Sequence, residues 1–231
     1  MEIKKLEWDS NFFGFPVGDL LVECETSDSK VFNSDFFTFF QVRSKYPLNI
    51  ISETHSLSHW EIKTIFSKNL DKSSEIKIDI IDFDDSKINE KLLYELAYES
   101  GKFSRYKLDK NIPNNKFKKL YQLWIKNSVN KSFADKIFYY KENDDIAGFV
   151  TVKIKDTFAQ IGLIAIEPNL QGKGIGKNLL LKVENYCLEN NVKRLLIPTQ
   201  SENEQACKFY TKMGYIISEE IIIKNYWKNN F

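Results

Sequence analysis

A glycine-rich turn is the part of this 231-residue chain whose residue types and spacing point most directly to chemistry. A β-rich run over 158–166 precedes Gln-Gly-Lys-Gly-Ile-Gly at 171–176, and an amphipathic helical pattern then continues to about Asn190. Glycines permit backbone conformations in which successive N–H groups converge on an anion, and a helix start adds free N–H donors and a positive dipole end. The turn therefore predicts a phosphate site, to which Lys173 and Lys177 add positive charge.

Two common phosphate-binding loops are excluded by the spacing. A P-loop needs a glycine where Gln171 stands, and a Ser or Thr for Mg²⁺ where Asn178 stands. A dinucleotide fingerprint, started from the first two glycines of the turn, needs a third glycine where Lys177 stands. The pattern that does fit is Q-x-x-G-x-G, formed by Gln171, Gly174 and Gly176.

This pattern resembles the pyrophosphate loop of the GCN5-related N-acetyltransferases (GNAT), which bind acetyl-CoA. A glycine-rich turn between a strand and a helix can also be purely structural, but the flanking strand, the flanking helix and the order of elements favour the family's loop. The resemblance implies acetyl-CoA as co-substrate, no metal, and a defined set of cofactor-binding residues. That set is Ile164, Ala165, Ile166, Gln171, Gly172, Lys173, Gly174, Ile175, Gly176, Lys177, Asn203 and Phe209.

Residues 199–215 resemble the strand, loop and helix that come next in the family. There, an Asn at the helix start contacts the pantetheine arm, a Tyr lies near the thioester sulfur, and a Gly-aromatic pair ends the helix. Asn203, Tyr210 and Gly214-Tyr215 fill these positions, although one extra residue separates Asn203 from Ala206. Two alternatives stay open: Asn203 as a plain helix cap, and Tyr210 as a core aromatic residue.

The implied reaction is the attack of an amine on a thioester carbonyl. Backbone N–H groups of residues 164–166 would stabilise the charge that builds on the oxygen, provided that this strand splays from its neighbour, as in the family. Tyr210 would act as general acid, because a hydroxyl of pKa about 10 can protonate a leaving thiolate whose conjugate pKa is about 8.5. No residue is marked as the base that deprotonates the amine, and an exposed water chain could take that role.

Three further stretches resemble a narrower group, the dTDP-fucosamine acetyltransferase-like proteins (dTDP-4-amino-4,6-dideoxygalactose N-acetyltransferases). They are residues 6–14 (LEWDSNFFG), 100–109 (SGKFSRYKLD) and 117–129, with its Leu-Tyr-x-x-Trp-Ile-x-x-Ser-Val core. The resemblance covers nearly the whole chain and implies that the acceptor is the amine of a nucleotide-linked amino sugar. The candidate substrate-binding residues are Arg105, Phe103, Tyr106 and Tyr121.

The chemistry of these side chains suits a nucleotide sugar. An arginine fork such as that of Arg105 matches a phosphate or a base edge, and aromatic rings can stack on a sugar or a base. Alternatively, Arg105 caps the preceding helix or pairs with an acid. Trp8 and Phe13 could contact substrate or could only hold two parts of the chain together.

Other functions stay open on the sequence alone. The acceptor amine could belong to a protein N-terminus, a lysine, a polyamine or an antibiotic, or the chain could be a non-catalytic acetyl-CoA-binding module. The intact Gln171, Gly174, Gly176 and Tyr210 weigh against a module that has lost activity. Charge does not choose among the acceptors, because balanced charges can segregate on folding.

The elements that must position these residues follow from periodicity. From residue 75 on, their order is β-α-α-β-β-β-α-β-α-β, which indicates a mixed α/β sheet with helices on its faces. The family resemblance implies a largely antiparallel GNAT sheet over 75–231, preceded by a small N-terminal α/β domain over 1–74 with its boundary in the polar stretch 69–74. The predicted elements are strands at 75–83, 137–141, 146–155, 158–166, 193–199 and 215–223, and helices at about 88–101, after Pro113, at 175–190 and at 203–213.

The amino-acid composition limits the classes of molecule that this chain is expected to bind. Hydrophobic residues make up 42% of the chain, enough for a core, and 33 basic against 32 acidic residues argue against a nucleic-acid binder. No apolar run is long enough to span a membrane, and the first ten residues contain no secretory apolar segment, so a cytoplasmic protein is expected. The expected partner is a small molecule rather than nucleic acid or a membrane, and a homodimer is left open.

Cysteines and histidines give no sign of a metal. Cys24, Cys187 and Cys207 lie far apart without a CxxC pair, which predicts free thiols. His55 and His59 have an i, i+4 spacing that would suit a metal on a helix, but Ser56 stands where a metalloprotease motif carries its glutamate. We therefore expect no metal site.

Overall fold

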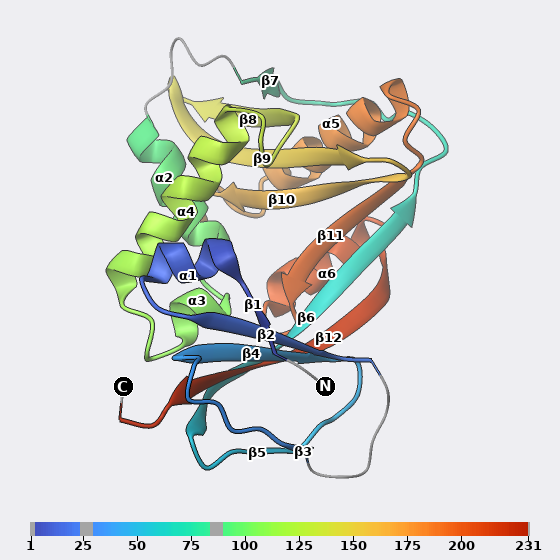
Figure 1. The fold of residues 1–231 in the computed structure, drawn as a ribbon. Coiled ribbons are helices and arrows are strands. Elements are labelled where there is room, and N and C mark those ends of the chain that lie inside the picture. Colours follow the sequence, from blue (N-terminus) through green and yellow to red (C-terminus); the bar gives the residue numbers. More distant parts are fainter. Residues whose placement is uncertain (1–2, 24–29, 84–89, 231) are drawn as a thin grey trace.

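A ten-stranded mixed sheet forms the centre of the molecule (Figure 1). The structure is a computed structural model, and it describes residues 3–23, 30–83 and 90–230. The strand order is β1-β2-β4-β12-β6-β11-β10-β9-β8-β7, and β3 pairs with β5 in a separate ribbon. The strands are β1 (Lys4–Lys5), β2 (Val17–Val22), β3 (Lys30–Val31), β4 (Phe39–Ser44), β5 (Ile50–Ile51), β6 (His55–Asn69), β7 (Ile81–Asp82), β8 (Lys136–Glu142), β9 (Asp145–Lys155), β10 (Phe158–Ile166), β11 (Arg194–Gln200) and β12 (Ile216–Lys228).

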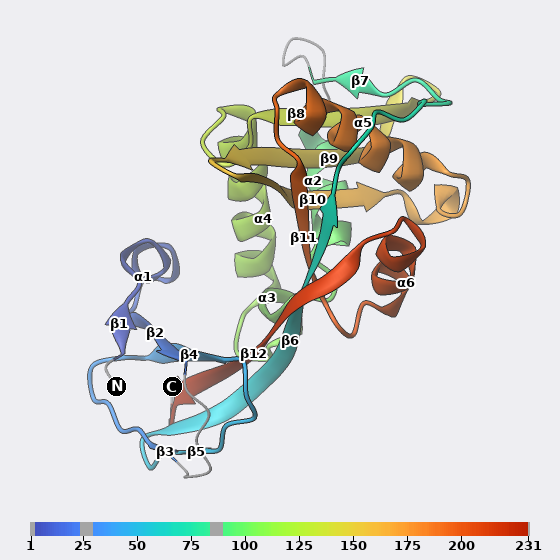
Figure 2. The same cartoon turned by 90° about the vertical axis from the view of Figure 1, so that its right-hand side faces the viewer.

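Helices cover both faces of the upper half of the sheet (Figure 2). Neighbouring residues of one strand therefore enter different cores: Phe149 packs under α2 and α4, whereas Val150 packs under α5. This is the period of two expected for a strand buried on both faces. The helices are α1 (Glu7–Phe13), α2 (Glu90–Ser100), α3 (Arg105–Leu108), α4 (Asn114–Val129), α5 (Ile175–Glu189) and α6 (Glu204–Lys212).

The predicted mixed α/β fold is confirmed, and so are most of its elements. The turn between β8 and β9 has both central residues, Asn143 and Asp144, at positive φ (51° and 67°), as a tight two-residue hairpin requires. The helices predicted at about 88–101 and after Pro113 are α2 and α4, although Ile88 lies outside the described residues.

The strand predicted at 75–83 is mostly wrong, because only Ile81–Asp82 pairs with another strand, β8. The remainder is extended chain whose backbone bonds to side chains of α5. The Ser74 N–H donates to Asn185 Oδ1 at 2.9 Å, and the Lys77 N–H donates to Asn178 Oδ1 at 2.8 Å. The alternation of apolar residues was real, but it matches packing against a helix instead of a sheet ladder.

The N-terminal region contributes a central strand. β6 pairs with β12 on one side and with β11 on the other, antiparallel to both. The predicted domain boundary between residues 74 and 75 therefore does not separate two sheets, because 55–69 share one sheet with 194–228. The last strand was expected to end at Ile223, but β12 continues to Lys228, because its second half pairs with β4.

The cysteines and histidines have ordinary structural surroundings. Cys187 and Cys207 are free, burial raises the pKa of the Cys187 thiol to about 12, and Cys24 lies outside the described residues. His55 and His59 lie on strand β6 rather than on a helix. Within the described ranges, no group of three potential metal ligands occurs, and no helix is long and apolar enough to cross a membrane.

Candidate active site

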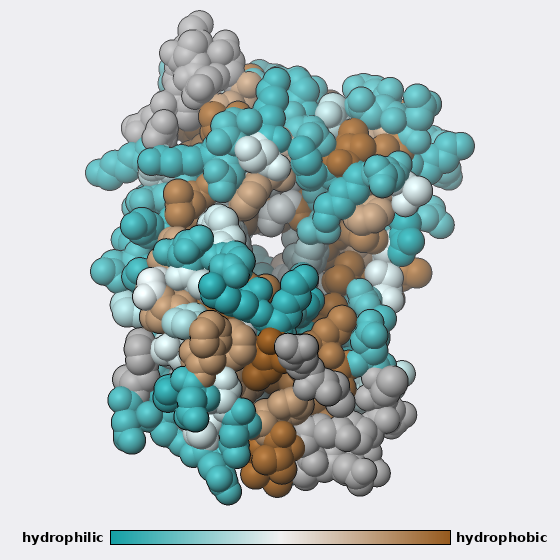
Figure 3. Space-filling view, viewed as in Figure 1, coloured by the Kyte–Doolittle hydropathy of each residue, from teal (hydrophilic) through white to brown (hydrophobic). Residues whose placement is uncertain are grey.

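A cavity of about 680 Å³ passes between β10 and β11 and is lined from both faces of the sheet. Figure 3 shows the molecule hollowed near its centre, between the upper and lower parts of the sheet. On one face the lining comes from the glycine-rich turn and α6, and on the other from α2, α3, α4 and β6. A molecule in the cavity can therefore meet a second molecule that enters from the opposite face.

The glycine-rich turn carries free backbone donors. Gly172 and Gly174 have φ of +80° and +85°, a conformation that only glycine adopts readily, and Gly174 caps α5. The N–H groups of residues 172–177 donate no hydrogen bond to any described residue. Free N–H groups at a helix start are what an anion site needs, so the phosphate site at this turn stays a prediction that the geometry allows.

Gln171 fixes the turn to the elements around it. Its Nε2 donates to the Ile166 carbonyl at 3.1 Å, and its Oε1 accepts from Gln205 Nε2 at 3.0 Å. Gly176 leaves room that a side chain would fill, because an added Cβ would lie 3.1 Å from Ile166 Cδ1 and 3.6 Å from the Phe209 ring. The glutamine and this glycine therefore set how closely the turn approaches β10 and α6.

β10 separates from β11 in the way the predicted chemistry requires (Figure 1). Parallel pairing with β11 covers only Ala159 and Gln160, whereas antiparallel pairing with β9 continues to Ile166. A bulge lies between Ile161 and Ile164, and it moves the odd-numbered residues from one face to the other. Ile161 packs in the core under α5, while Leu163 packs in the core under α2 and α4.

The bulge also aims backbone donors into the gap. The Leu163 N–H donates to Thr151 Oγ1 at 2.9 Å, and the Glu167 N–H donates to the Ala147 carbonyl at 2.8 Å, both toward β9. N–H directions alternate along a strand, so those of Ile164 and Ile166 point away from β9, into the gap.

Tyr210 lines this cavity from α6. Its ring lies 5.5 Å from Phe66 and 5.4 Å from Phe209, so it is packed as well as accessible to the cavity. The Tyr210 hydroxyl has no hydrogen-bond partner among the described residues, and burial raises its pKa, so the group stays protonated. A fixed, protonated hydroxyl beside a cavity can serve as a proton donor.

Asn203 begins α6 and also lines the cavity. Its Oδ1 accepts from the Ala206 N–H at 3.3 Å, which is the bond of a helix N-cap. The structure thus contains the cap that the sequence left open as an alternative. The amide nitrogen of Asn203 has no partner in the described part of the chain, so the cap leaves it available.

The opposite end of the cavity is built around Arg105. Glu61 Oε2 accepts from the Arg105 N–H at 2.8 Å, and Glu61 Oε1 accepts from Nη1 at 3.1 Å. Nη2 donates to the Tyr106 hydroxyl at 3.0 Å. Burial would lower the pKa of Arg105, but Tyr106 and Glu61 outweigh it, so the guanidinium stays charged. Arg105 therefore has the acidic partner that the sequence offered as an alternative, and it still lines the cavity.

Aromatic rings form one wall of this end. The Tyr121 and Trp124 rings lie 4.7 Å apart on α4, and Tyr106 meets Trp124 edge-on at 6.0 Å. Gly101 makes room for Tyr121, since an added Cβ would lie 2.5 Å from its hydroxyl. Three aromatic rings beside an arginine can stack on a flat ligand.

Most of the predicted site residues meet at this cavity, but three do not line it. Ile175 is buried beneath the start of α5, Lys173 lies on the turn outside the lining, and the Phe103 ring packs with Lys102 at 5.5 Å. Each of the three neighbours a residue that does line the cavity, so the segments reach the cavity although these three side chains do not line it.

Sequence reasoning missed the contribution of β6. Lys63 and Glu61 reach the end of the site around Arg105 from the same face of β6. Trp124 on α4, also not predicted as a site residue, adds to the aromatic wall. The alternation of residues 55–69 could have indicated a strand, but nothing local shows which strands it joins. Pairing with β11 and β12 is what brings it to the site.

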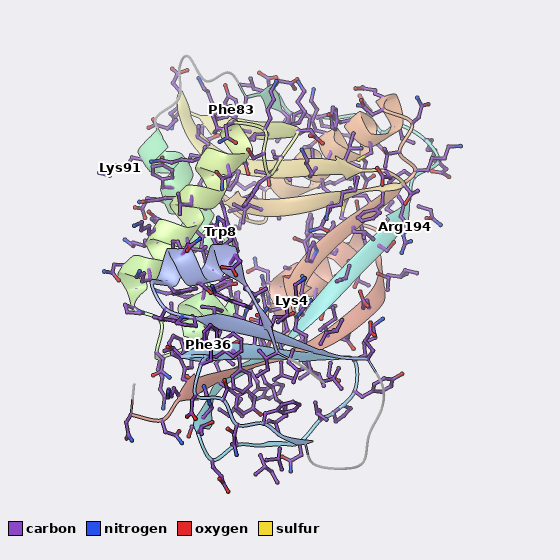
Figure 4. All side chains as sticks on the ribbon, viewed as in Figure 1. Lys4, Trp8, Phe36, Phe83, Lys91 and Arg194 are labelled. Atoms are coloured by element: carbon purple, nitrogen blue, oxygen red, sulfur yellow. The ribbon has the colours of Figure 1, made fainter. Side chains whose placement is uncertain are left out.

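The N-terminal motif residues hold α1 in place. Phe13 is buried, whereas Trp8 is 43% exposed and stacks on Phe12 with ring centroids 5.4 Å apart. Lys116 Nζ on α4 donates to the Phe12 carbonyl at 3.2 Å. Figure 4 shows Trp8 on α1, beside α4. Phe12 therefore joins α1 to α4, and Phe13 joins α1 to β4 through its contact with Phe39. A contact of Trp8 or Phe13 with substrate stays a prediction.

Known proteins share the sequence pattern and the fold of this chain. The sequence model of the acetyltransferase (GNAT) family matches residues 94–215, just over half of the chain. The spore coat polysaccharide biosynthesis protein SpsD of Bacillus subtilis is 26% identical over 133 residues, 58% of this chain and 46% of that protein. Streptothricin acetyltransferase A of the same organism is 37% identical over 82 residues, 34% of this chain and 46% of that protein.

A solved structure shares the fold. The GCN5-related N-acetyltransferase from Sphaerobacter thermophilus has a TM-score of 0.54 at 13% identity, covering 81% of this chain and 60% of that one. The present chain spans about half the length of both curated relatives named above.

Proposed function

Because this chain belongs to the acetyltransferase (GNAT) family, we propose that it transfers the acetyl group of acetyl-CoA to the amine of a nucleotide-linked amino sugar. The observation that carries the proposal is the cavity that joins the free N–H groups of the turn to the gap between β10 and β11. One end suits the diphosphate of acetyl-CoA, and the gap leads its thioester toward the other face.

The residues present fit acetyl-CoA. The N–H groups of 172–177 and the cations of Lys173 and Lys177 would hold its diphosphate. The Asn203 amide would meet the pantetheine arm. Acetyl-CoA supplies the activated acyl group; no metal is invoked.

The chain's own groups then act on the reacting atoms. The N–H groups of Ile164 and Ile166 would donate to the carbonyl oxygen as negative charge builds on it. The Tyr210 hydroxyl would donate its proton to the sulfur that leaves. The amine loses its proton to water, since the structure singles out no base.

The sugar acceptor rests on two supports. The aromatic wall and Arg105 suit a flat ring next to a phosphate. SpsD, whose name places it in polysaccharide biosynthesis, is similar over more than half of this chain. The proposal implies a cytoplasmic setting, where acetyl-CoA and activated sugars occur together.

A second candidate acceptor is an antibiotic amine. It is favoured by the similarity to streptothricin acetyltransferase A over 82 residues. That similarity covers only a third of this chain, and family members share their cofactor half irrespective of the acceptor.

A turnover assay tests the proposal. Release of free CoA from acetyl-CoA is measured with dTDP-4-amino-4,6-dideoxyhexoses, streptothricin, spermidine and a lysine peptide as acceptors. We expect release with the nucleotide sugars above the no-acceptor rate. Turnover only with another amine would reject the sugar, and a protein whose melting temperature does not respond to acetyl-CoA would reject the transferase itself.

A further inference from the structure

Two positively charged side chains lie at the end of the cavity around Arg105, called the acceptor end below. The negative charge nearby is too small to neutralise both. Lys63 and Arg105 both line the cavity, and the side-chain nitrogen of Lys63 forms no hydrogen bond or ion pair with any described residue. Burial lowers the pKa of Lys63 most, and the positive charge of Arg105 lowers it further. Each of the two cations therefore makes it less favourable for the other to be charged. Two like charges facing one buried space indicate that an anion belongs there.

The nearby acidic residues do not neutralise both Lys63 and Arg105. Both carboxylate oxygens of Glu61, which is 1% exposed, are taken by Arg105. The other acids that act on these cations, Asp9 and Glu219, make no ion pair with either in the described part of the chain, and Glu219 pairs with Lys45 instead. One bound carboxylate therefore faces two cations.

A buried nitrogen of the guanidinium lacks a partner. Arg105 Nε makes no hydrogen bond with any described residue. Ser104 Oγ is buried beside it and interacts with the Tyr121 hydroxyl. Both residues line the cavity. Buried polar groups normally have hydrogen-bond partners, so the unpaired Arg105 Nε at this site calls for an explanation.

We propose that Lys63 and Arg105, supported by Ser104, form a subsite for a phosphate group of the acceptor, on the face of the sheet opposite the glycine-rich turn. The subsite rests on the proposed function, because it assumes that a donor occupies the other end of the same cavity. Glu61 is a positioning residue: it holds the guanidinium and the start of α3 and does not touch the ligand.

The two anion sites differ in construction. The turn offers backbone N–H groups to the donor's diphosphate, whereas this subsite offers side-chain cations to the acceptor. A nucleotide diphosphate supplies the required charge next to a sugar ring that the wall of Tyr106, Tyr121 and Trp124 can stack on. Amines without an anionic group would meet two positive charges and bind poorly.

A titration with the turn already filled tests the subsite. The protein is saturated with CoA, and inorganic pyrophosphate or dTDP is then added while tryptophan fluorescence is followed, since Trp124 lines the cavity. We expect a second binding event, weakened about tenfold or more in Lys63→Met and largely retained in Lys63→Arg. Lys72→Met, which removes an exposed lysine, is the matched control and should bind as the unaltered protein does.

The outcomes separate this proposal from the previous one. If CoA binds but no second anion event follows, or if Lys63→Met and Lys72→Met bind pyrophosphate alike, the subsite is wrong and the transferase stands. If CoA itself does not bind, the transferase proposal fails first. Thermal melting of each variant confirms that it is folded. Should Lys63→Met fail to fold, Lys63→Gln, which removes the charge but keeps a polar side chain, takes its place in the comparison with Lys63→Arg.

Discussion

The two ends of the cavity are built on different principles. The proposed donor end is one contiguous stretch, residues 171–177, whose free backbone N–H groups lie at a helix start. The proposed acceptor end collects side chains from β6 and from α3 and α4, and β6 lies far from the two helices in the sequence. A backbone site depends on turn geometry and tolerates most side chains, whereas a side-chain site depends on the identity of each residue and on the topology that assembles it.

The strongest effect should come from the backbone of the donor end. Gly174 has φ of +85°, so Gly174→Val strains the turn that positions the free N–H groups. We expect acetyl-CoA affinity to fall more than about 100-fold by isothermal titration calorimetry, because several N–H contacts are lost together.

Gly14 supplies the control for that variant. It also has φ of +85°, with nothing within 4 Å of an added Cβ, but it ends α1 away from the cavity. Gly14→Val should lower thermal stability by a similar backbone strain and keep acetyl-CoA affinity. Equal losses of affinity in both variants would mean that the effect comes from strain and not from the turn.

Tyr210→Phe should lower kcat by about 100-fold, because it removes a positioned proton donor. Acetyl-CoA affinity should change little, since the ring and its contacts with Phe66 and Phe209 remain. Steady-state kinetics and calorimetry on the same protein separate the two quantities. An unchanged kcat would exclude Tyr210 as the acid.

The pH profile gives a second check on Tyr210. Burial raises the pKa of its hydroxyl, so the proton-donating form persists to higher pH than for a free tyrosine. kcat should therefore show no alkaline fall from this group up to about pH 10, the ordinary tyrosine pKa. A fall of kcat near pH 8 that disappears in Tyr210→Phe would contradict this.

The same contrast explains what the sequence could predict. Gln171, Gly174 and Gly176 are close in the chain, so their spacing alone indicates the turn, the helix start and the anion site. Lys63 and Glu61 could not be found in this way, because their place depends on β6 lying between β11 and β12. For the same reason, the boundary expected near residue 74 does not divide the sheet.

Smaller errors have local causes. The strand expected at 75–83 has the right alternation, but the Lys77 N–H in it donates to Asn178 on α5, and Asn185 of the same helix holds Ser74 just before it. No periodicity reveals such side-chain partners. Phe103 is predicted as a ring that could stack on a sugar or a base, but its side chain does not line the cavity, whereas Arg105 and Tyr106 of the short helix α3 do.

At the acceptor end, the role of Arg105 can be tested only if the charge of its partner Glu61 is removed with it. Arg105→Met alone leaves Glu61 buried without its cation, which should cost about 3–5 kcal/mol of stability. The double variant Arg105→Met with Glu61→Gln avoids an unpaired charge and should melt near the unaltered protein. If Arg105 binds the acceptor, the double variant still raises the acceptor KM about tenfold at an unchanged KM for acetyl-CoA. A normal acceptor KM in the stable double variant would assign the pair to structure alone.

The smallest expected effect separates the two roles of Asn203. Asn203→Ala removes the side-chain bond to the Ala206 N–H and should cost about 1 kcal/mol of stability. Asn203→Asp keeps an oxygen that can cap α6 but lacks the amide nitrogen, which is the group free to meet the pantetheine arm. Stability measured by denaturant unfolding should therefore fall in Asn203→Ala only, while acetyl-CoA affinity falls a few-fold in both. If Asn203→Asp binds acetyl-CoA normally and only the destabilised Asn203→Ala loses affinity, Asn203 acts as a helix cap alone. The donor end would then depend on backbone N–H groups without a contribution from the Asn203 side chain.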